Sequence, residues 1–357
     1  MTILIILLLS PVLSPKAFAA DLGDSLDLEA LVEQLPGEAG EALEGLSPLT
    51  LPDKTPEGLL DSLRTLLRRE AAGVAHTAGV LLTVCVLVSL SGALELGGGA
   101  PQYILFAGVA AVSAAALSDF DSYLRSGLDS VDSLAEYAKV LLPVLASAVA
   151  ATGAVSGAAA RCAATSFFIS VLLELSRRVI VPCICAHAAL SVADAAVGNN
   201  ALRTAKKLVK KSCTILLSAL CVMFTAWLTL SGVVSDTADA LTARAAKTAI
   251  SASLPVVGSI LSDAASTLAA AAGGLKNSIG VFGLMAVAGI CLTPFVKLGV
   301  RFLAYRLSAA LCECVSDKRF STLAEDLGSC FGMILALNGT AALMLFLSVY
   351  SMIRTVI

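Results

Sequence analysis

Charged and aromatic residues are scarce in this sequence. Only 14% of the 357 residues are charged and 5% are aromatic, while 57% are hydrophobic. Soluble domains carry about 25% charged residues, so this shortage excludes an ordinary water-soluble globular protein. The net charge of −3 and the few aromatics also give no sign of a nucleic-acid binder. Because the apolar residues form runs of about 20, long enough to cross a bilayer core, we predict an all-α, polytopic helical membrane protein.

Residues 1–20 resemble a signal peptide, although no lysine or arginine precedes their apolar run. Residues 17–20 (Ala-Phe-Ala-Ala) fit the small-x-small pattern at which signal peptides are cleaved. An uncleaved anchor is the alternative, and in both cases we expect residue 21 onward to begin outside the cytoplasm. Ten acidic residues and one basic residue between 21 and 60 predict a short acidic extracytoplasmic segment over 21–70.

Eight apolar segments are candidates for crossing a membrane. They lie at 72–94, 102–118, 140–160, 163–197, 213–233, 248–275, 279–315 and 330–352, and the first two form a pair within 71–120. Two of the eight, 163–197 and 279–315, are too long for one crossing and contain Pro182 and Pro294. We therefore expect each to be two short or broken helices, which gives about eight to ten membrane segments.

A basic stretch in the middle of the chain indicates the orientation. Positively charged loops stay on the cytoplasmic side, so we predict a cytoplasmic loop here and an external acidic loop over 119–136. This requires 163–197 to cross as a pair. A count of ten crossings places Lys297 and Arg301 near the outer face; treating 248–275 as re-entrant brings them inside, and both topologies stay open. The predicted cytoplasmic loop contains Arg203, Lys206, Lys207, Lys210 and Lys211.

Two segments of the chain show a faint internal repeat. The Leu-Pro-Val motif at 142–144 recurs at 254–256, and the proline at 182 recurs at 294, both at an offset of 112 residues. Weak symmetry of this kind is typical of transporter-like folds, although prolines are common in membrane helices and the match could be coincidence. We infer tandem units over 121–233 and 234–357. The predicted helix breaks are Pro143, Pro182, Pro255 and Pro294.

Small residues recur at the spacing that lets membrane helices pack closely. In lipid, helices associate through close backbone contact, for which glycine at every fourth position is typical. The same faces could instead serve homo-oligomerisation or line a pore. The predicted packing positions are Gly153, Gly157, Gly258, Gly328 and Gly332.

Charged residues inside apolar stretches are the candidate functional residues, because placing a charge in hydrocarbon is costly. Asp263 breaks the internal symmetry, since the equivalent position 112 residues earlier is Ala151. It lies either on a permeation path or on an interfacial helix. Glu174 has the spacing to form a local helical ion pair with Arg177 or Arg178. The full set is Asp263, Glu174, Arg177, Arg178, Lys297 and Arg301.

Catalytic and cofactor motifs are missing from the sequence. It has no G-x-x-x-x-G-K-[ST] loop and no H-E-x-x-H motif. Cys183, Cys185 and His187 cannot converge on a metal from one helix, because Cys185 points away from Cys183. We therefore expect no enzymatic activity, no metal and no cofactor, with energy for any transport coming from a gradient or a partner.

Four stretches resemble stage III sporulation protein AE of endospore-forming bacteria. They are Arg244-Ala-Ala-Lys-Thr248, Leu254-Pro-Val-Val-Gly-Ser-Ile-Leu-Ser-Asp263, Leu275-Lys-Asn-Ser-Ile-Gly280 and Phe302-Leu-Ala-Tyr-Arg-Leu-Ser-Ala-Ala310. The resemblance implies a multi-pass protein of the mother-cell membrane facing the forespore, in a channel or transport complex needed for spore development. It implies as partners other proteins of the stage III sporulation operon, including an ATPase-like subunit, and a forespore-side channel protein.

Two other functions remain open beside that of a channel subunit. The chain could be a non-conducting scaffold that recruits ring-forming sporulation partners, or a stand-alone secondary transporter.

Overall fold

The computed structural model describes residues 57–93, 100–253, 258–315 and 318–354, together with positions 31, 33 and 35. Side chains are described for most of these residues. The exceptions are 57–63, 71–72, 74–77, 91–93, 100–102, 118–119, 232–240, 243–244, 246–269, 271 and 315. The predicted signal peptide at 1–20, Pro255 and the side chain of Asp263 therefore lie outside the described residues, as does most of the acidic segment.

Almost all of the described residues are helical. The elements are α5 (Glu57–Ala93), α6 (Ala100–Ala151), α7 (Val155–Leu175), the π-helical turn η2 (Ser176–Ile180), α8 (Val181–Val197), α9 (Asn200–Ser253), α10 (Gly258–Val315) and α11 (Lys318–Ile353). This agrees with the all-α prediction.

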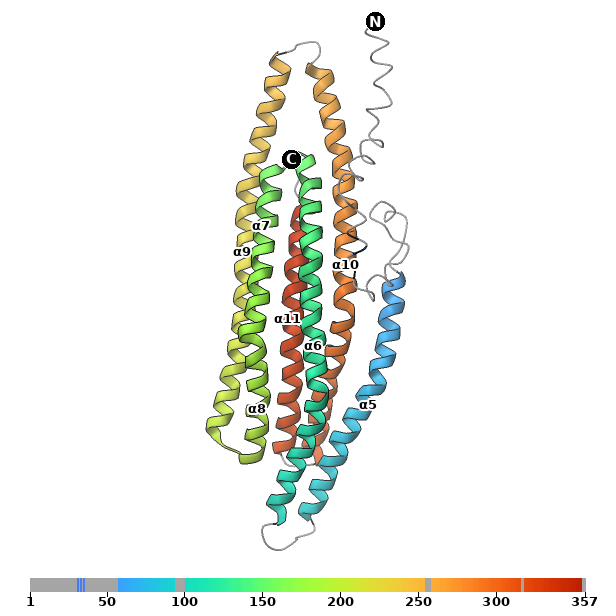
Figure 1. The fold of residues 1–357 in the computed structure, drawn as a ribbon, viewed down its shortest axis with the longest axis vertical. Coiled ribbons are helices and arrows are strands. Elements are labelled where there is room, and N and C mark those ends of the chain that lie inside the picture. The colour runs from blue at the N-terminus through green and yellow to red at the C-terminus, as the bar shows by residue number, and fades with distance from the viewer. Residues whose placement is uncertain are drawn as a thin grey trace.

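The helices lie side by side as an elongated antiparallel bundle (Figure 1). The last turns of α5, α8 and α10 and the first turns of α6, α9 and α11 lie toward the lower end of the view (Figure 1). We call this the basic end because the basic stretch 203–211 begins there. The turn after α6 and the last turns of α9 and α11 lie toward the opposite end. The end of α9 and the start of α10 extend beyond the other labelled helices there (Figure 1).

Five helices among the described residues are long and apolar enough to cross a membrane, and Ala78–Leu90 is a shorter apolar helix. This number is lower than the predicted eight to ten membrane segments, because segments that were predicted as separate lie on the same helix. The segments 102–118 and most of 140–160 lie on α6, and the acidic stretch 119–136 between them is helix, not a loop. The five candidate spans are Tyr103–Ala151, Val155–Val197, Asn200–Ser231, Ala272–Cys314 and Lys318–Ile353.

The described prolines do not reverse the chain, so the predicted helix breaks are wrong at three positions. Pro143 lies inside α6 and Pro294 inside α10. Pro182 lies in the first turn of α8, directly after η2. A π-turn widens the backbone by one residue, which makes room for the proline ring without ending the rod. The segment 163–197 is therefore one continuous rod.

The predicted repeat boundaries do not coincide with turns. Position 121 falls inside α6 and position 234 inside α9. The tandem repeat stays a prediction.

The α6–α7 turn contains one of the predicted packing glycines. Gly153 adopts a φ of 101° there, so it shapes a turn and does not pack one helix face against another. Gly157 is buried near the start of α7, and Gly258 begins α10. Gly328 and Gly332 lie where α11 crosses α10. A Cβ at Gly328 would lie 2.9 Å from Tyr305 Cβ, and one at Gly332 3.1 Å from the Phe302 ring.

Candidate functional site

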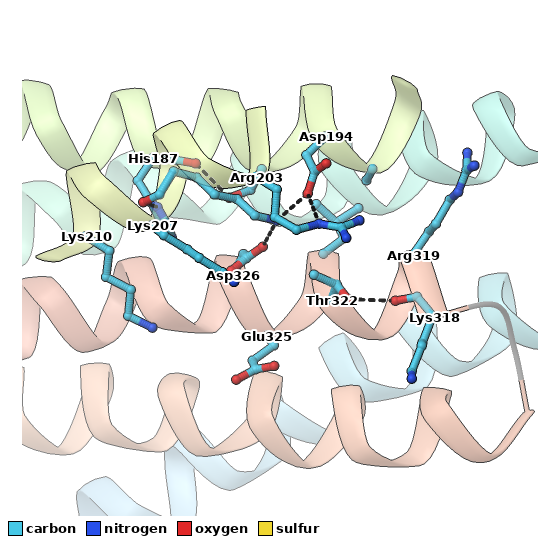
Figure 2. A pocket seen from close by; sticks show the side chains of 14 residues that line it. His187, Asp194, Arg203, Lys207, Lys210, Lys318, Arg319, Thr322, Glu325 and Asp326 are labelled. Carbon is cyan, nitrogen blue, oxygen red and sulfur yellow. Dashed lines mark hydrogen bonds and ion pairs between the residues drawn. The ribbon is translucent and has the colours of Figure 1, made fainter. Parts of the chain in front are cut away.

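A buried lysine joins three helices at the basic end. The Lys206 side chain on α9 is 4% exposed, and its Nζ lies 2.6 Å from Asp194 Oδ2 of α8 and 2.5 Å from Asp326 Oδ2 of α11. Asp194 is equally buried, and Asp326 is 16% exposed. We call Lys206, Asp194 and Asp326 the Lys206 cluster. Figure 2 shows the two aspartates on different helices, each with a dashed line to another member of this cluster. A charge this deeply buried persists only when it is paired, so Lys206 and the aspartates hold each other in place.

Further polar contacts surround this lysine. Arg203 Nε lies 3.8 Å from Asp194 Oδ2, and His187 Nδ1 lies 3.1 Å from the carbonyl oxygen of Lys206. Ser191 Oγ donates to the His187 carbonyl at 2.7 Å, and Lys210 Nζ donates to Ser329 Oγ at 2.8 Å. Within the described part of the chain, His187 Nε2 and Asp194 Oδ1 are buried without a hydrogen-bond partner.

The basic stretch is not the loop that was predicted. It forms the first turns of α9, which begins at Asn200 after a turn at Gly198. Asn199 Oδ1 accepts a hydrogen bond from the Ala201 amide at 2.9 Å, a side-chain contact that stabilises a helix start. Gly198 closes α8 with a φ of 70°, a conformation that glycine adopts without strain. The helical spacing turns Lys206 inward and leaves Lys207 and Lys211 exposed.

A second polar feature is a stripe of charged side chains along α6. Five of its members are exposed and Asp132 is half-buried. Arg125 pairs with Asp121 at 2.8 Å, and Lys139 pairs with Glu136 at 2.7 Å. The opposite side of α6 is buried against the bundle, through residues such as Leu134. We call this stripe the charged face of α6: Asp121, Arg125, Asp129, Asp132, Glu136 and Lys139.

Residues of the neighbouring rod extend the charged face. Arg177 Nη2 of η2 lies 2.8 Å from Asp132 Oδ1, so this predicted residue pairs across helices. Arg178 pairs with Glu174 within its own rod, at the local spacing that the sequence predicts. All three of these predicted residues are exposed.

The charged face lies level with the apolar middle of α10 and α11. The Tyr123 and Phe331 rings are 5.7 Å apart, which sets α6 against α11 at one end of the stripe. Further along α6, a Cβ added at Gly127 would clash with the Ile334 side chain of α11. Near the other end, a Cβ at Gly283 of α10 would lie 2.8 Å from Leu141 Cδ1 of α6. The stripe therefore runs beside the candidate spans and not beyond their ends.

Other helices present apolar side chains on the bundle surface. On α9, Val222, Trp227 and Leu230 are all more than half exposed, and α9 lies at the left edge of the bundle in Figure 1. Leu303 and Leu307 of α10 are exposed as well. Such surfaces suit lipid, whereas the charged face of α6 does not.

Two other predicted residues lie away from these features. Arg301 is buried where α10 meets α6: its Nε donates to Tyr123 Oη at 2.7 Å, and its guanidinium lies 4.9 Å from the Tyr123 ring centroid. Tyr123 Oη in turn donates to Glu70 Oε2 of α5 at 3.4 Å. Lys297 is half-buried on α10. Arg301 thus connects three helices and does not join the Lys206 cluster.

Lys206 was among the residues singled out from the sequence, but Asp194 and Asp326 were not, and His187 was considered only as a metal ligand. A single aspartate in a helical segment has no distinguishing pattern. Its role depends on which helices become neighbours, here α8, α9 and α11. Asp132 was missed for the same reason, because it lay in a presumed loop.

Comparison with known proteins supports one family. The sequence profile of stage III sporulation protein AE matches residues 53–355, which include nearly all of the described helices. A curated relative, stage III sporulation protein AE of Bacillus subtilis (strain 168), is 24% identical over 235 residues, covering 65% of this chain and 58% of the relative. The match thus spans less than two thirds of that relative's length. No solved structure matches the chain. The chain belongs to the stage III sporulation protein AE family.

Proposed function

We propose that this chain is a multi-pass membrane subunit of the channel or transport complex between mother cell and forespore, and that it has no enzymatic activity of its own. Family membership supports a role in sporulation. Five long apolar helices support a membrane location. The proposal adds that the charged face of α6 borders a water-filled path.

The charged face carries this proposal. Its six residues span 121–139, which is about 27 Å at 1.5 Å per residue, close to the thickness of a bilayer core of about 30 Å. One charged residue at the centre of a membrane helix costs about 2.5–3.5 kcal/mol on insertion scales, so a full stripe facing lipid is untenable. Pairs such as Arg177 with Asp132 reduce this cost, but both side chains remain accessible. Water or another protein must therefore cover this face.

The orientation follows from the basic end. Arg203, Lys207 and Lys211 on α9 and Lys318 and Arg319 on α11 lie near its connections, which favours the cytoplasm for this end. The proposal takes α5 as a further crossing, through its shorter apolar stretch Ala78–Leu90. The N-terminal segment is then placed outside the cytoplasm, on the side that the sequence predicts. The number of crossings before the basic stretch stays odd in this proposal, as it is in the sequence-based topology. Residues 100–151 cross once instead of twice, and 155–197 cross once instead of as a pair, so two crossings fewer leave the predicted sides unchanged.

Partners complete the proposed path. A single α6 covers one side of a water-filled path, so further copies of the chain or other subunits would enclose it. The family resemblance suggests other proteins of the stage III sporulation operon, an ATPase-like subunit that supplies energy and a forespore-side channel protein. The cell membrane of the mother cell, on the side that faces the forespore, is the proposed location.

Cysteine labelling in sporulating cells tests the water-filled path. Ser122→Cys and Ser126→Cys change one atom each on the α6 surface, in a background where the exposed Cys185 and Cys314 are replaced by alanine. We expect a membrane-impermeant, thiol-reactive cation to label both positions, because the reactive thiolate forms readily in water. The matched controls, Ala226→Cys and Leu230→Cys on the exposed apolar side of α9, should not react.

The scaffold alternative predicts a different result. If protein subunits cover the charged face, the α6 cysteines stay unlabelled in the assembled complex and react only when the chain is produced without its partners. That result would replace the path with a protein interface. Labelling of the α9 positions as fast as the α6 positions would contradict the proposed placement in lipid.

A further inference from the structure

A basic cavity of about 410 Å³ lies between α8, α9 and α11 at the basic end. Figure 2 shows side chains from these helices around it. Its lining includes three acidic side chains, Asp194, Glu325 and Asp326. It also includes six basic side chains, Arg203, Lys206, Lys207, Lys210, Lys318 and Arg319.

The acidic residues of this lining are already paired. Lys206 pairs with both aspartates, and Arg306 Nη1 of α10 lies 3.1 Å from Glu325 Oε1. In the described part of the chain, Lys207 and Lys318 form no ion pair at all. Both α9 and α11 begin next to the cavity, and the amide groups at a helix start favour an anion. The cavity therefore carries an excess of positive charge.

His187 supplies a second indication of a ligand. It lines the same cavity and is 1% exposed, yet its Nε2 has no hydrogen-bond partner among the described residues. A buried ring nitrogen usually finds a partner in the folded state. Because Nδ1 faces the Lys206 carbonyl oxygen and donates to it, Nε2 of the neutral ring is a hydrogen-bond acceptor. A hydroxyl group on the headgroup of a bound ligand would provide the missing donor.

An apolar groove continues from the basic cavity. It has a volume of about 520 Å³ between α9, α10 and α11, and is lined by residues such as Leu217, Phe302, Met333 and Ala336. Lys210 lines both spaces, and its Nζ bonds to Ser329 on the groove side. A cationic pocket thus adjoins a groove of the character that suits an acyl chain.

We propose that this combined site binds an anionic phospholipid. The phosphate lies among Lys207, Lys210 and Lys318, and one acyl chain follows the groove past Met333 and Ala336. Basic pockets between membrane helices on the cytoplasmic side favour acidic headgroups, and the apolar groove favours a lipid over a soluble phosphate. The inference rests on the proposed membrane location, but not on whether the bundle conducts.

Lipid titration of the purified full-length chain in detergent tests the site. We expect dioleoyl phosphatidylglycerol to raise the melting temperature and dioleoyl phosphatidylcholine to leave it unchanged. Lys207→Gln combined with Lys318→Gln should weaken the phosphatidylglycerol affinity roughly thirtyfold, because two cationic contacts are lost. Ala336→Phe fills the groove and should abolish the shift. Controls are Lys211→Gln and Ala219→Phe, exposed positions on α9 outside both linings.

Three outcomes overturn the proposal. Equal shifts with the two lipids would show that the site does not select an anionic headgroup. A full shift in either site variant, with an unliganded melting temperature equal to that of its control, would place the lipid elsewhere. Inorganic phosphate at matched ionic strength is the third probe: if it reproduces the whole shift and Ala336→Phe has no effect, the cavity binds soluble phosphate. None of these results bears on the labelling of α6.

Discussion

Replacing Lys206 with methionine would leave two aspartates in the bundle without their shared cation. Asp194 is 4% exposed and bonded to Lys206 Nζ at 2.6 Å, so it cannot regain its hydration. Asp326 is 16% exposed and recovers part of its hydration. Breaking one side of a buried ion pair costs about 3–5 kcal/mol. We expect a loss near the lower end, about 3 kcal/mol, because Arg203 at 3.8 Å partly compensates Asp194.

Thermal unfolding of the purified protein in one detergent measures this effect. Lys211→Met is the control: Lys211 is exposed on the same helix, and surface substitutions change stability by about 0.5 kcal/mol or less. A triple variant with Lys206→Met, Asp194→Asn and Asp326→Asn should recover most of the loss, because no buried charge is left unpaired. The reasoning is refuted if Lys206→Met melts with the wild type, or if the triple variant melts no higher than Lys206→Met.

Two further substitutions test helix packing and the permeation hypothesis. Gly328→Ala places a Cβ 2.9 Å from Tyr305 Cβ and should lower the free energy of unfolding by about 1–3 kcal/mol. Gly299→Ala meets open space and should raise the free energy of unfolding by up to about 1 kcal/mol. Equal melting temperatures of the two variants would contradict this packing. If Asp263 lies on a conducting path, Asp263→Asn should preserve protein level and complex assembly but stop forespore growth; full sporulation in that variant would exclude the conducting role.

The helical character of the chain could be predicted from its apolar runs, but not how the runs are joined. The charged residues of 119–136 suggested a loop between two short spans. In the structure this stretch is helical, because its apolar residues, such as Val131 and Leu134, are buried against the bundle while its charges stay on the opposite surface. Hydropathy averages over both faces and so cannot separate an amphipathic helix from a polar loop. Pro182 was misinterpreted for a similar reason, since a π-turn at 176–180 accommodates it.

The candidate site was only half visible before the structure. Lys206 was one of five basic residues with equal standing in the sequence, and its burial sets it apart. Glu174 and Arg178 formed the local pair that helical spacing predicts, whereas Arg177 turned instead to Asp132 on α6. Local spacing limits partners within one helix, but it contains no information about a partner 45 residues away.

The sequence by itself determined a helical, lipid-compatible chain, the basic character of the 203–211 stretch and the family to which the chain belongs, because composition, charge and motif are local properties. Tertiary structure alone decided that Lys206 meets Asp194 and Asp326, that α6 carries its charges level with apolar neighbours, and that a basic cavity adjoins an apolar groove. Each of these depends on helices far apart in the chain becoming neighbours, and helix packing settles that arrangement.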